Sequence, residues 1–217
     1  MRKVAVVLSG CGVYDGAEIN EAVLTLLCLD QQGAQYQCFA PDIEQRHVVN
    51  HLTGEVAEGE TRNVKVEAAR IARGNVLDLA EMNVSVFDAL VVPGGFGAAK
   101  NLCDFAVANA QMTVQADFLA VARAFHAADK PIGLICIAPV MAAAICGDGT
   151  RCTIGNDEET ARAIRAMGGE HLECPASEAR VDAEKKMVTT PAYMLAGSVS
   201  EAYSGIFSCV REVLALA

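Results

Sequence analysis

The chain has 217 residues, of which 53% are hydrophobic and 20% charged, and its formal net charge at pH 7 is −10. This acidic balance leaves no basic stripe for a phosphate backbone, so nucleic acid is excluded as an expected partner. No apolar run approaches the roughly 20 residues that a membrane helix needs, and residues 1–3 lead directly into a predicted strand rather than into a signal peptide. We therefore expect a single α/β domain over residues 1–217, in the cytoplasm and not in a membrane.

The first part of the chain alternates a strand with a helix. Residues 4–8 (VAVVL) form a continuous apolar run that is typical of a buried strand, and a glycine-rich loop follows them. A largely apolar helix is predicted to begin near Asp15 and to end before Gly33. Asp15 and Glu18 have the spacing of a capping box, which gives both of them a structural task at the start of this helix.

The rest of the chain repeats the alternation. The predicted elements are, in order, a strand over 36–40, a long polar loop over 41–62, a helix over 63–73, a strand over 89–92, a helix over 116–128, a strand ending at Cys136, helices over 138–146 and 158–167, a hairpin of 179–182 with 186–190, and a helix from about 198. Repeated strand–helix units predict a doubly wound, mostly parallel sheet in a flavodoxin-like three-layer sandwich. Its ligands should bind beyond the carboxyl ends of the strands.

Cys136 follows an apolar strand at a sharp turn, which is a typical position for a nucleophile. A helix that begins there would favour the thiolate through its N-terminal partial charge, and Pro139 is well suited to the first turn of such a helix. The alternative is that Cys136 is a buried core residue, as free cysteines often are. We expect most of the nine cysteines to be core residues, since their number is odd and no CxxC pair occurs, which disfavours a disulfide framework or a zinc site.

Two glycine-rich loops should meet Cys136 at the same edge of the sheet. In the loop over 93–97, Gly94 and Gly95 let the backbone approach a substrate closely, so that their N–H groups can point at a developing oxyanion. The N–H group of Ile137 would be a further donor. The alternative is that the two glycines only form a tight turn.

The other loop carries Cys11 between two glycines at 10 and 12. It begins like a dinucleotide-binding fingerprint, but the third glycine is displaced, so no dinucleotide cofactor is expected. Cys11 is either a resolving thiol for Cys136 or a packed loop residue.

Six motifs together resemble one protein family. They are residues 9–16, 50–55, 60–64, 93–101, 136–139 and 188–194. They look like the PfpI-like, class I glutamine amidotransferase-like superfamily, and within it the ElbB branch of enhancing-lycopene-biosynthesis proteins. The resemblance implies a nucleophilic Cys136, an oxyanion loop at Pro-Gly-Gly, and a homodimer, for which the apolar last helix over 206–216 offers a patch.

The resemblance also implies an acidic residue on the first helix that hydrogen-bonds the cysteine. Counting back from Gly33 as the family spacing requires gives Glu21, whose alternative role is that of a solvated helix carboxylate. Glu18 is nearby but has the capping task already described. A carboxylate beside a thiolate requires a raised pKa, so that the two groups share a proton.

One departure from the family affects the mechanism. Ile137 stands where many members have a histidine, so the Cys–His dyad is missing. Nor is there a His-x-Glu arrangement, and glutamine hydrolysis and proteolysis are therefore both disfavoured. His51, in the long loop, is the one histidine considered as an accessory group near the site.

The function that the resemblance implies is that of a glyoxalase. Such an enzyme would convert a small 2-oxoaldehyde, methylglyoxal or glyoxal, to the hydroxy acid without glutathione, metal or other cofactor, in connection with isoprenoid metabolism. The alternative is a non-catalytic redox sensor or partner-binding protein, in which Cys136 is oxidised reversibly under stress.

Overall fold

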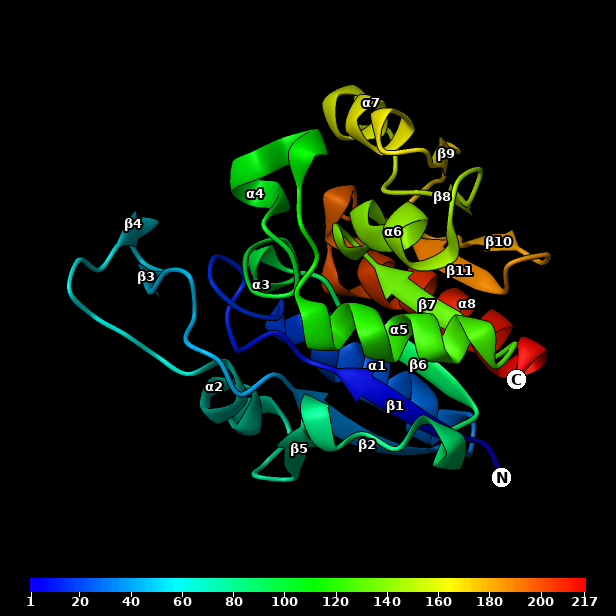
Figure 1. The fold of residues 1–217 in the computed structure, drawn as a ribbon, viewed down its shortest axis with the longest axis horizontal. Coiled ribbons are helices and arrows are strands. Elements are labelled where there is room, and N and C mark those ends of the chain that lie inside the picture. Colours follow the sequence, from blue (N-terminus) through cyan, green and yellow to red (C-terminus); the bar gives the residue numbers. More distant parts are fainter.

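A seven-stranded sheet runs through the centre of the computed structural model, which describes residues 1–217 (Figure 1). Its strands are β1 (Lys3–Val7), β2 (Gln35–Ala40), β5 (Val76–Asp78), β6 (Ala89–Val92), β7 (Ile132–Ile135), β10 (Arg180–Asp182) and β11 (Met187–Thr190). The strand order is β10-β11-β7-β6-β1-β2-β5, and every neighbouring pair is parallel except β10 with β11. The doubly wound, mostly parallel sheet is therefore confirmed, and the predicted hairpin is its antiparallel edge.

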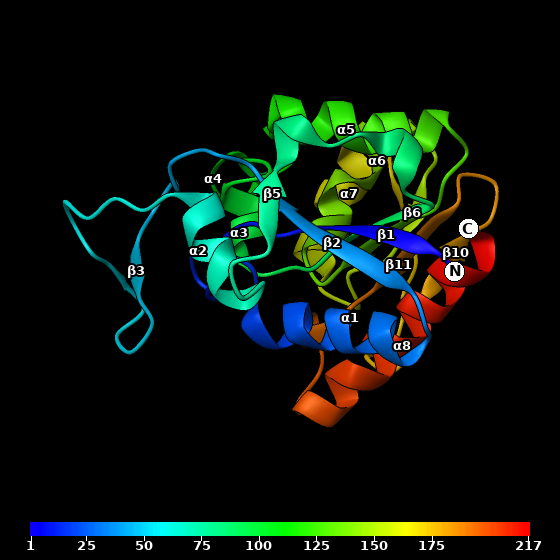
Figure 2. The ribbon, with the colours of Figure 1, turned by 90° about the horizontal axis from the view of Figure 1, so that it is seen from below.

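Helices cover both faces of this sheet. The α-helices are α1 (Ile19–Gln31), α2 (Val64–Ile71), α3 (Phe96–Lys100), α4 (Phe105–Ala108), α5 (Ala116–Ala127), α6 (Ala142–Cys146), α7 (Glu158–Ala166) and α8 (Val199–Leu216). Figure 2 shows α1 and α8 on one side of the sheet and α5 and α6 on the other. Short 3-10 helices complete the set: η1 (Leu79–Glu81), η2 (Val84–Val86), η3 (Asn109–Gln111), η4 (Ala138–Met141) and η5 (Ala192–Met194).

Strand β1 shows how the sheet divides the core into two parts. Val4 and Val6 pack in the hydrophobic cluster that contains residues of α1 and α8, whereas Ala5 and Val7 pack in the cluster that contains residues of α5. Successive side chains of a strand point to opposite faces, so a strand covered on both faces is apolar at every position. This is why residues 4–8 read as a continuous apolar run.

The start of α1 differs from the prediction. Glu18, not Asp15, is the N-cap, and its carboxylate accepts a hydrogen bond from the Glu21 N–H at 2.6 Å. Asp15 instead accepts a hydrogen bond from the Val49 N–H at 2.7 Å. The predicted capping box of Asp15 with Glu18 is therefore wrong, because the Asp15 side chain hydrogen-bonds a residue that is distant in sequence.

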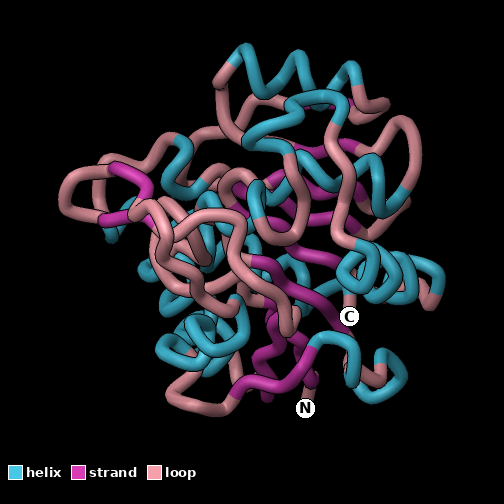
Figure 3. The backbone as a smooth tube through the Cα atoms, turned by 60° about the vertical axis from the view of Figure 1, so that its left-hand side comes forward, coloured by secondary structure: helices cyan, strands magenta, loops and turns pink.

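The polar loop over 41–62 contains a hairpin of two-residue strands, β3 (Val49–Asn50) and β4 (Glu55–Val56). It stands out from the body of the protein (Figure 3), and Leu52 at its turn is 95% exposed. A second small sheet pairs β8 (Arg151–Cys152) with β9 (Glu170–His171).

The apolar last helix buries one face in the core and leaves Phe207, Leu214 and Leu216 partly exposed, so the patch that the sequence suggests for a dimer stays a prediction. Five of its apolar side chains are buried in the core beneath the sheet: Ala202, Ile206, Cys209, Val210 and Val213. The apolar pattern of α8 is explained by packing within the chain.

Eight of the nine cysteines are likewise buried, as expected, and all nine are free. None of the helices combines the length and apolar character that crossing a bilayer requires.

Candidate active site

Cys136 lies immediately after β7, where the chain turns sharply into η4. Its φ angle is +63°, in the left-handed region that residues other than glycine seldom occupy. The Cys136 N–H donates a hydrogen bond to the Thr190 carbonyl at 2.9 Å, which ties the turn to the end of β11. The thiol is 7% exposed and reaches a cavity at the carboxyl edge of the sheet. The placement is therefore the strand-to-turn position that the sequence predicts.

Glu21, in the first turn of α1, lies against this thiol. Its side chain is fully buried and hydrogen-bonds the Cys136 side chain. Its carboxylate also accepts the Gly94 N–H at Oε2 (3.0 Å) and the Tyr193 N–H at Oε1 (3.1 Å). The structure thus places Glu21, not Glu18, beside the sulfur. Glu18 lines the cavity and caps α1.

Burial governs the titration of both groups. It raises the pKa of Glu21 to about 7, although the hydrogen bonds from Tyr193, Cys136 and Gly94 act in the opposite direction. Burial, and after it the charge of Glu21, raises the pKa of the Cys136 thiol well above its usual value. The two groups form a coupled pair in which the carboxyl loses its proton first and the thiol retains its own.

The expectation that a helix N-terminus would favour the Cys136 thiolate is therefore corrected. The residues after the turn form the 3-10 helix η4, and α6 begins only at Ala142 and is five residues long. So short an element supplies little dipole, and burial beside a carboxylate outweighs it.

The glycines of the loop after β6 have different tasks. The N–H groups of Gly95 and Ile137 hydrogen-bond the Cys136 sulfur, and Gly95 has a φ of +88°. The Gly94 N–H is bound to Glu21, so Gly94 is not available as the oxyanion donor that was predicted. Gly94 is needed for close approach instead, because a Cβ atom there would lie 2.4 Å from the Cβ atom of Cys136.

The cavity beside Cys136 has a volume of about 390 Å³. Most of its wall is apolar, including Val13, Phe96, Phe105, Ile137 and Met194. Its polar lining residues are Glu18, Asp157, Thr160 and Tyr193. Sequence reasoning did not single out Phe105 or Asp157, which come from α4 and from the N-cap of α7; the only local signal was the N-cap pattern of Asp157 and Thr160.

The two remaining candidates lie away from this cavity. His51 accepts a hydrogen bond from the Tyr14 N–H (3.2 Å) and donates from Nδ1 to the Val49 carbonyl (3.0 Å), so its ring joins the hairpin to the first glycine loop. The charged groups that act on Cys11 are Glu67, Arg70 and Asp15, and neither Cys11 nor His51 lines the cavity. The structure does not bring them to Cys136 as accessory groups. No group of three or more His, Cys, Asp or Glu side chains is arranged to hold a metal ion.

Comparison with known proteins gives relatives that match almost the whole chain, although no protein-family model matches it. It is 48% identical over 223 aligned residues to the human glutamine amidotransferase-like class 1 domain-containing protein 3, mitochondrial, covering 99% of this chain and 83% of that protein. It is 46% identical to the ES1 protein homolog, mitochondrial, of Rattus norvegicus (99% and 84% covered). The ES1 protein, mitochondrial, of Danio rerio is 33% identical (97% and 84% covered).

These names correct the expectation of a cytoplasmic protein, since all three relatives are named mitochondrial. That expectation rested on the lack of an apolar secretory segment. The lack of such a segment carries no information about mitochondria, because their targeting segments are amphipathic rather than continuously apolar.

Among solved structures, an isoprenoid biosynthesis protein with an amidotransferase-like domain from Ehrlichia chaffeensis superposes with a TM-score of 0.93. Its identity is 38%, and the match covers 100% of this chain and 99% of that one. Glyoxalase III from Candida albicans superposes with a TM-score of 0.60 at 13% identity, covering 99% and 97% of the two chains. This second likeness shows a shared fold.

Proposed function

Because the chain belongs to the family of ES1 proteins and glutamine amidotransferase-like class 1 domain proteins, with a DJ-1/PfpI-type fold, we propose that it is a cysteine-dependent enzyme of the glyoxalase type. Its substrate is a small 2-oxoaldehyde, such as methylglyoxal or glyoxal, and its product is the hydroxy acid. One observation carries the proposal: a buried carboxyl group with a pKa of about 7 hydrogen-bonds a thiol that opens onto a cavity.

The first step is addition of the Cys136 sulfur to the aldehyde carbon. A carbon–sulfur bond forms, the carbonyl π bond breaks, and the oxygen takes up the proton that Cys136 and Glu21 share, giving a hemithioacetal. The singly protonated pair is the reactive form, because it can place its proton on the carboxyl group and leave a thiolate. The N–H groups of Gly95 and Ile137, which hydrogen-bond the sulfur, stabilise that thiolate and the oxyanion that forms beside it.

The second step moves a proton between adjacent carbons. The Glu21 carboxylate removes the proton from the carbon bonded to sulfur, giving an enediolate, and returns it to the neighbouring carbon, while the hydroxyl proton passes from the first oxygen to the second. The result is a thioester of the 2-hydroxy acid, which water hydrolyses to the acid and the free Cys136 thiol. The overall change adds one water and involves no external oxidant or reductant. A carboxyl group with a pKa near the working pH is well matched to a proton that must be taken up and given back.

Glutamine hydrolysis is not part of the proposal. The family name refers to amidotransferases, but Ile137 follows Cys136, and the cavity wall contains no histidine. A thiol acting on an amide would need such a base to protonate the leaving amine.

The redox-sensor alternative depends on an accessible thiolate, whereas Cys136 is 7% exposed and its pKa is raised.

The experiment that tests the proposal is steady-state turnover of methylglyoxal, with lactate measured by proton NMR. We expect the unmodified protein to form lactate and Cys136→Ala to form none above the uncatalysed rate. Cys11→Ala is the matched control, because Cys11 is a partly exposed thiol outside the cavity. If Cys136→Ala formed lactate as fast as the unmodified protein, the mechanism would be refuted.

A further inference from the structure

We propose that the cavity beside Cys136 selects uncharged carbonyl compounds with a bulky apolar substituent and discriminates against those that carry a carboxylate. This inference rests on the proposed function, since it takes Cys136 as the group that meets the carbonyl. It also goes beyond that function, because methylglyoxal and glyoxal have no such substituent. The size of the cavity, its wall and its charges each support the inference.

The size and the wall of the cavity favour an apolar substituent. Cavities of roughly 300–1,000 Å³ hold ligands much larger than methylglyoxal, and this one measures about 390 Å³. Phe96 of α3, Phe105 of α4 and Met194 of η5 face the cavity from three different elements. Their apolar surface remains in contact with water unless a substituent covers it, so covering it favours binding.

The ionisable carboxyl groups around the cavity have no basic counterpart in its wall. Glu18 and Asp157 are in the wall, and Glu21 lies behind Cys136. Asp157 accepts a hydrogen bond from the Thr160 N–H at 2.8 Å, and the hydrogen bonds from Thr160 lower the pKa of its carboxyl group. Asp157 is therefore ionised at neutral pH. A substrate carboxylate would have to approach these groups without a positive partner.

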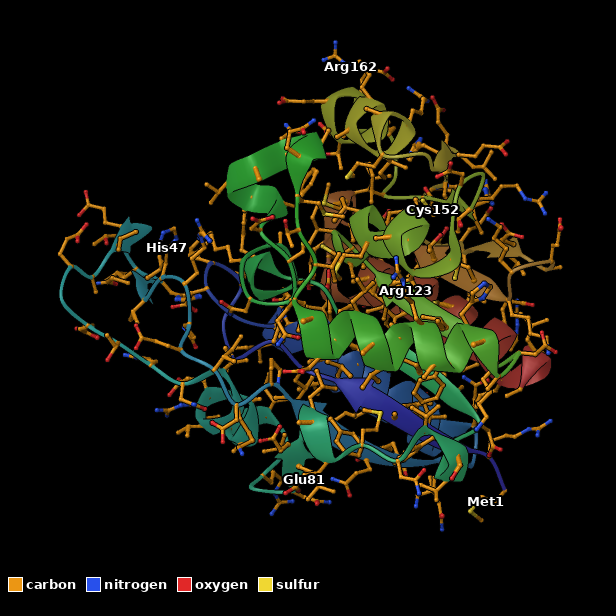
Figure 4. All side chains as sticks on the ribbon, in the orientation of Figure 1. Met1, His47, Glu81, Arg123, Cys152 and Arg162 are labelled. Carbon is orange, nitrogen blue, oxygen red and sulfur yellow. The ribbon has the colours of Figure 1, made fainter.

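No basic side chain lines the cavity, although the charge of Arg162 helps to lower the pKa of Asp157. The lining residues include no lysine, arginine or histidine. Arg162 on α7 points outward, away from the rest of the molecule (Figure 4). Lys100 donates a hydrogen bond to the Tyr14 carbonyl at 2.8 Å, and its Nζ atom lies 5.2 Å from the centroid of the Phe96 ring without lining the cavity. The charge preference of the cavity therefore comes from its carboxylates.

The test measures how well different aldehydes protect Cys136 from alkylation by iodoacetamide, followed by mass spectrometry. The probes are methylglyoxal, phenylglyoxal and glyoxylate, and each value is divided by the affinity of that aldehyde for N-acetylcysteine, which removes its intrinsic reactivity. We expect half-maximal protection by phenylglyoxal at a concentration about tenfold or more below that of methylglyoxal. For glyoxylate we expect a concentration about tenfold or more above it.

Variants of the cavity wall separate the effect of its apolar side chains from the effect of its carboxylates. Phe105→Ala should reduce the advantage of phenylglyoxal, and Val107→Ala is its control, because Val107 is on the same helix but 58% exposed and outside the wall. Asp157→Asn keeps an N-cap oxygen but loses the charge, so it should improve protection by glyoxylate. Glu159→Gln removes a neighbouring charge that does not line the cavity and should change nothing.

Equal protection by glyoxylate and methylglyoxal after normalisation would overturn the inference, as would phenylglyoxal being no better than methylglyoxal. These comparisons need only the unmodified protein, so they do not depend on the folding of any variant. Protection requires no turnover. Selective protection without formation of a hydroxy acid would therefore refute the proposed enzyme and support the selectivity of the cavity. Turnover without selective protection would support the enzyme and refute the selectivity. If no aldehyde protected Cys136, both proposals would be refuted.

Discussion

The Glu21 carboxyl group hydrogen-bonds the Cys136 thiol in the interior of the protein, where neither side chain is more than 7% exposed. Two acidic groups in such a place cannot both be ionised without a large cost, so they hold at least one proton between them at neutral pH. A change in either group therefore alters the titration of the other.

Glu21→Gln should lower the pKa of the Cys136 thiol. The charge of Glu21 raises that pKa, and a neutral amide removes this effect while the Gly95 and Ile137 N–H groups continue to stabilise the thiolate. The pH dependence of Cys136 alkylation, followed by mass spectrometry, should therefore shift to lower pH. Glu18→Gln is the control, because Glu18 acts on Glu21 rather than on the thiol. An unchanged or higher alkylation midpoint in Glu21→Gln would contradict the assignment.

Turnover should rise with pH through about 7. The pair must lose one proton before the sulfur can attack, and the first proton to leave is that of the Glu21 carboxyl group, with a pKa of about 7. Glu21→Gln should reduce kcat for methylglyoxal by about 10²–10⁴-fold, the usual contribution of a general acid–base group, and abolish the rise near pH 7. A pH–rate profile of the variant that kept this limb would show that another group titrates there.

Glu21 should also make the protein less stable as the pH rises. Its pKa is raised from its usual value of 4.5 to about 7, so between these values the folded protein binds a proton that the unfolded chain has released. The contribution to stability is fully present below pH 4.5 and is lost as the pH rises through 7. Its size is about 3–4 kcal/mol, since one pKa unit corresponds to roughly 1.4 kcal/mol. In urea unfolding from pH 4.5 to 8, the free energy of unfolding of the unmodified protein should fall by this amount relative to that of Glu21→Gln.

Gly94→Ala should destroy the site and destabilise the fold. Its Cβ atom would lie 2.4 Å from the Cβ atom of Cys136 and 2.8 Å from Oε2 of Glu21, and neither group can move aside in the packed interior. We expect a loss of about 1–3 kcal/mol in the free energy of unfolding, as for other overpacked positions, together with loss of turnover. Gly197→Ala is the matched control, because the only atom near its Cβ position is 3.8 Å away. Full activity in Gly94→Ala would mean that the loop is less confined than described.

Asp15→Ala should release the projecting hairpin. The buried Asp15 carboxylate accepts the Val49 N–H at 2.7 Å, and without it a buried donor is left unpaired, at a cost of about 1–3 kcal/mol. Limited proteolysis should then cleave the hairpin faster than in the unmodified protein. The control is Asp30→Ala, which replaces an exposed aspartate on α1. In this variant the protease should cleave the hairpin at the original rate. Equal cleavage in both variants would show that other contacts hold the hairpin.

The strands that the sequence predicts well are those buried on both faces. β6 agrees with its predicted bounds and β1 differs by one residue at each end, because a continuous apolar run leaves little choice of structure. β8 and β9 have two residues each, too few for any periodicity to appear. Their existence depends on where the rest of the chain places them.

Some residues of the candidate site could likewise be located from the sequence, and others could not. Cys136 could be located from a local pattern, an apolar strand followed by a turn. Glu21 came from the family resemblance, because nothing near it in sequence distinguishes it from Glu18 as a helix N-terminal acid. Phe105 and Asp157 could not be located, since their place in the cavity depends on how α4 and α7 pack above the sheet edge.

The partners of Glu21 come from parts of the chain that are distant in sequence. The carboxyl group is on α1, and it is bound by Gly94 after β6, Cys136 after β7 and Tyr193 after β11. In any partly folded chain that lacks one of these strands, the carboxyl group would be open to water and would titrate like an ordinary glutamate. Carboxyl protonation near pH 7, followed by infrared spectroscopy during refolding, would therefore report the moment at which the last of the three strands has docked.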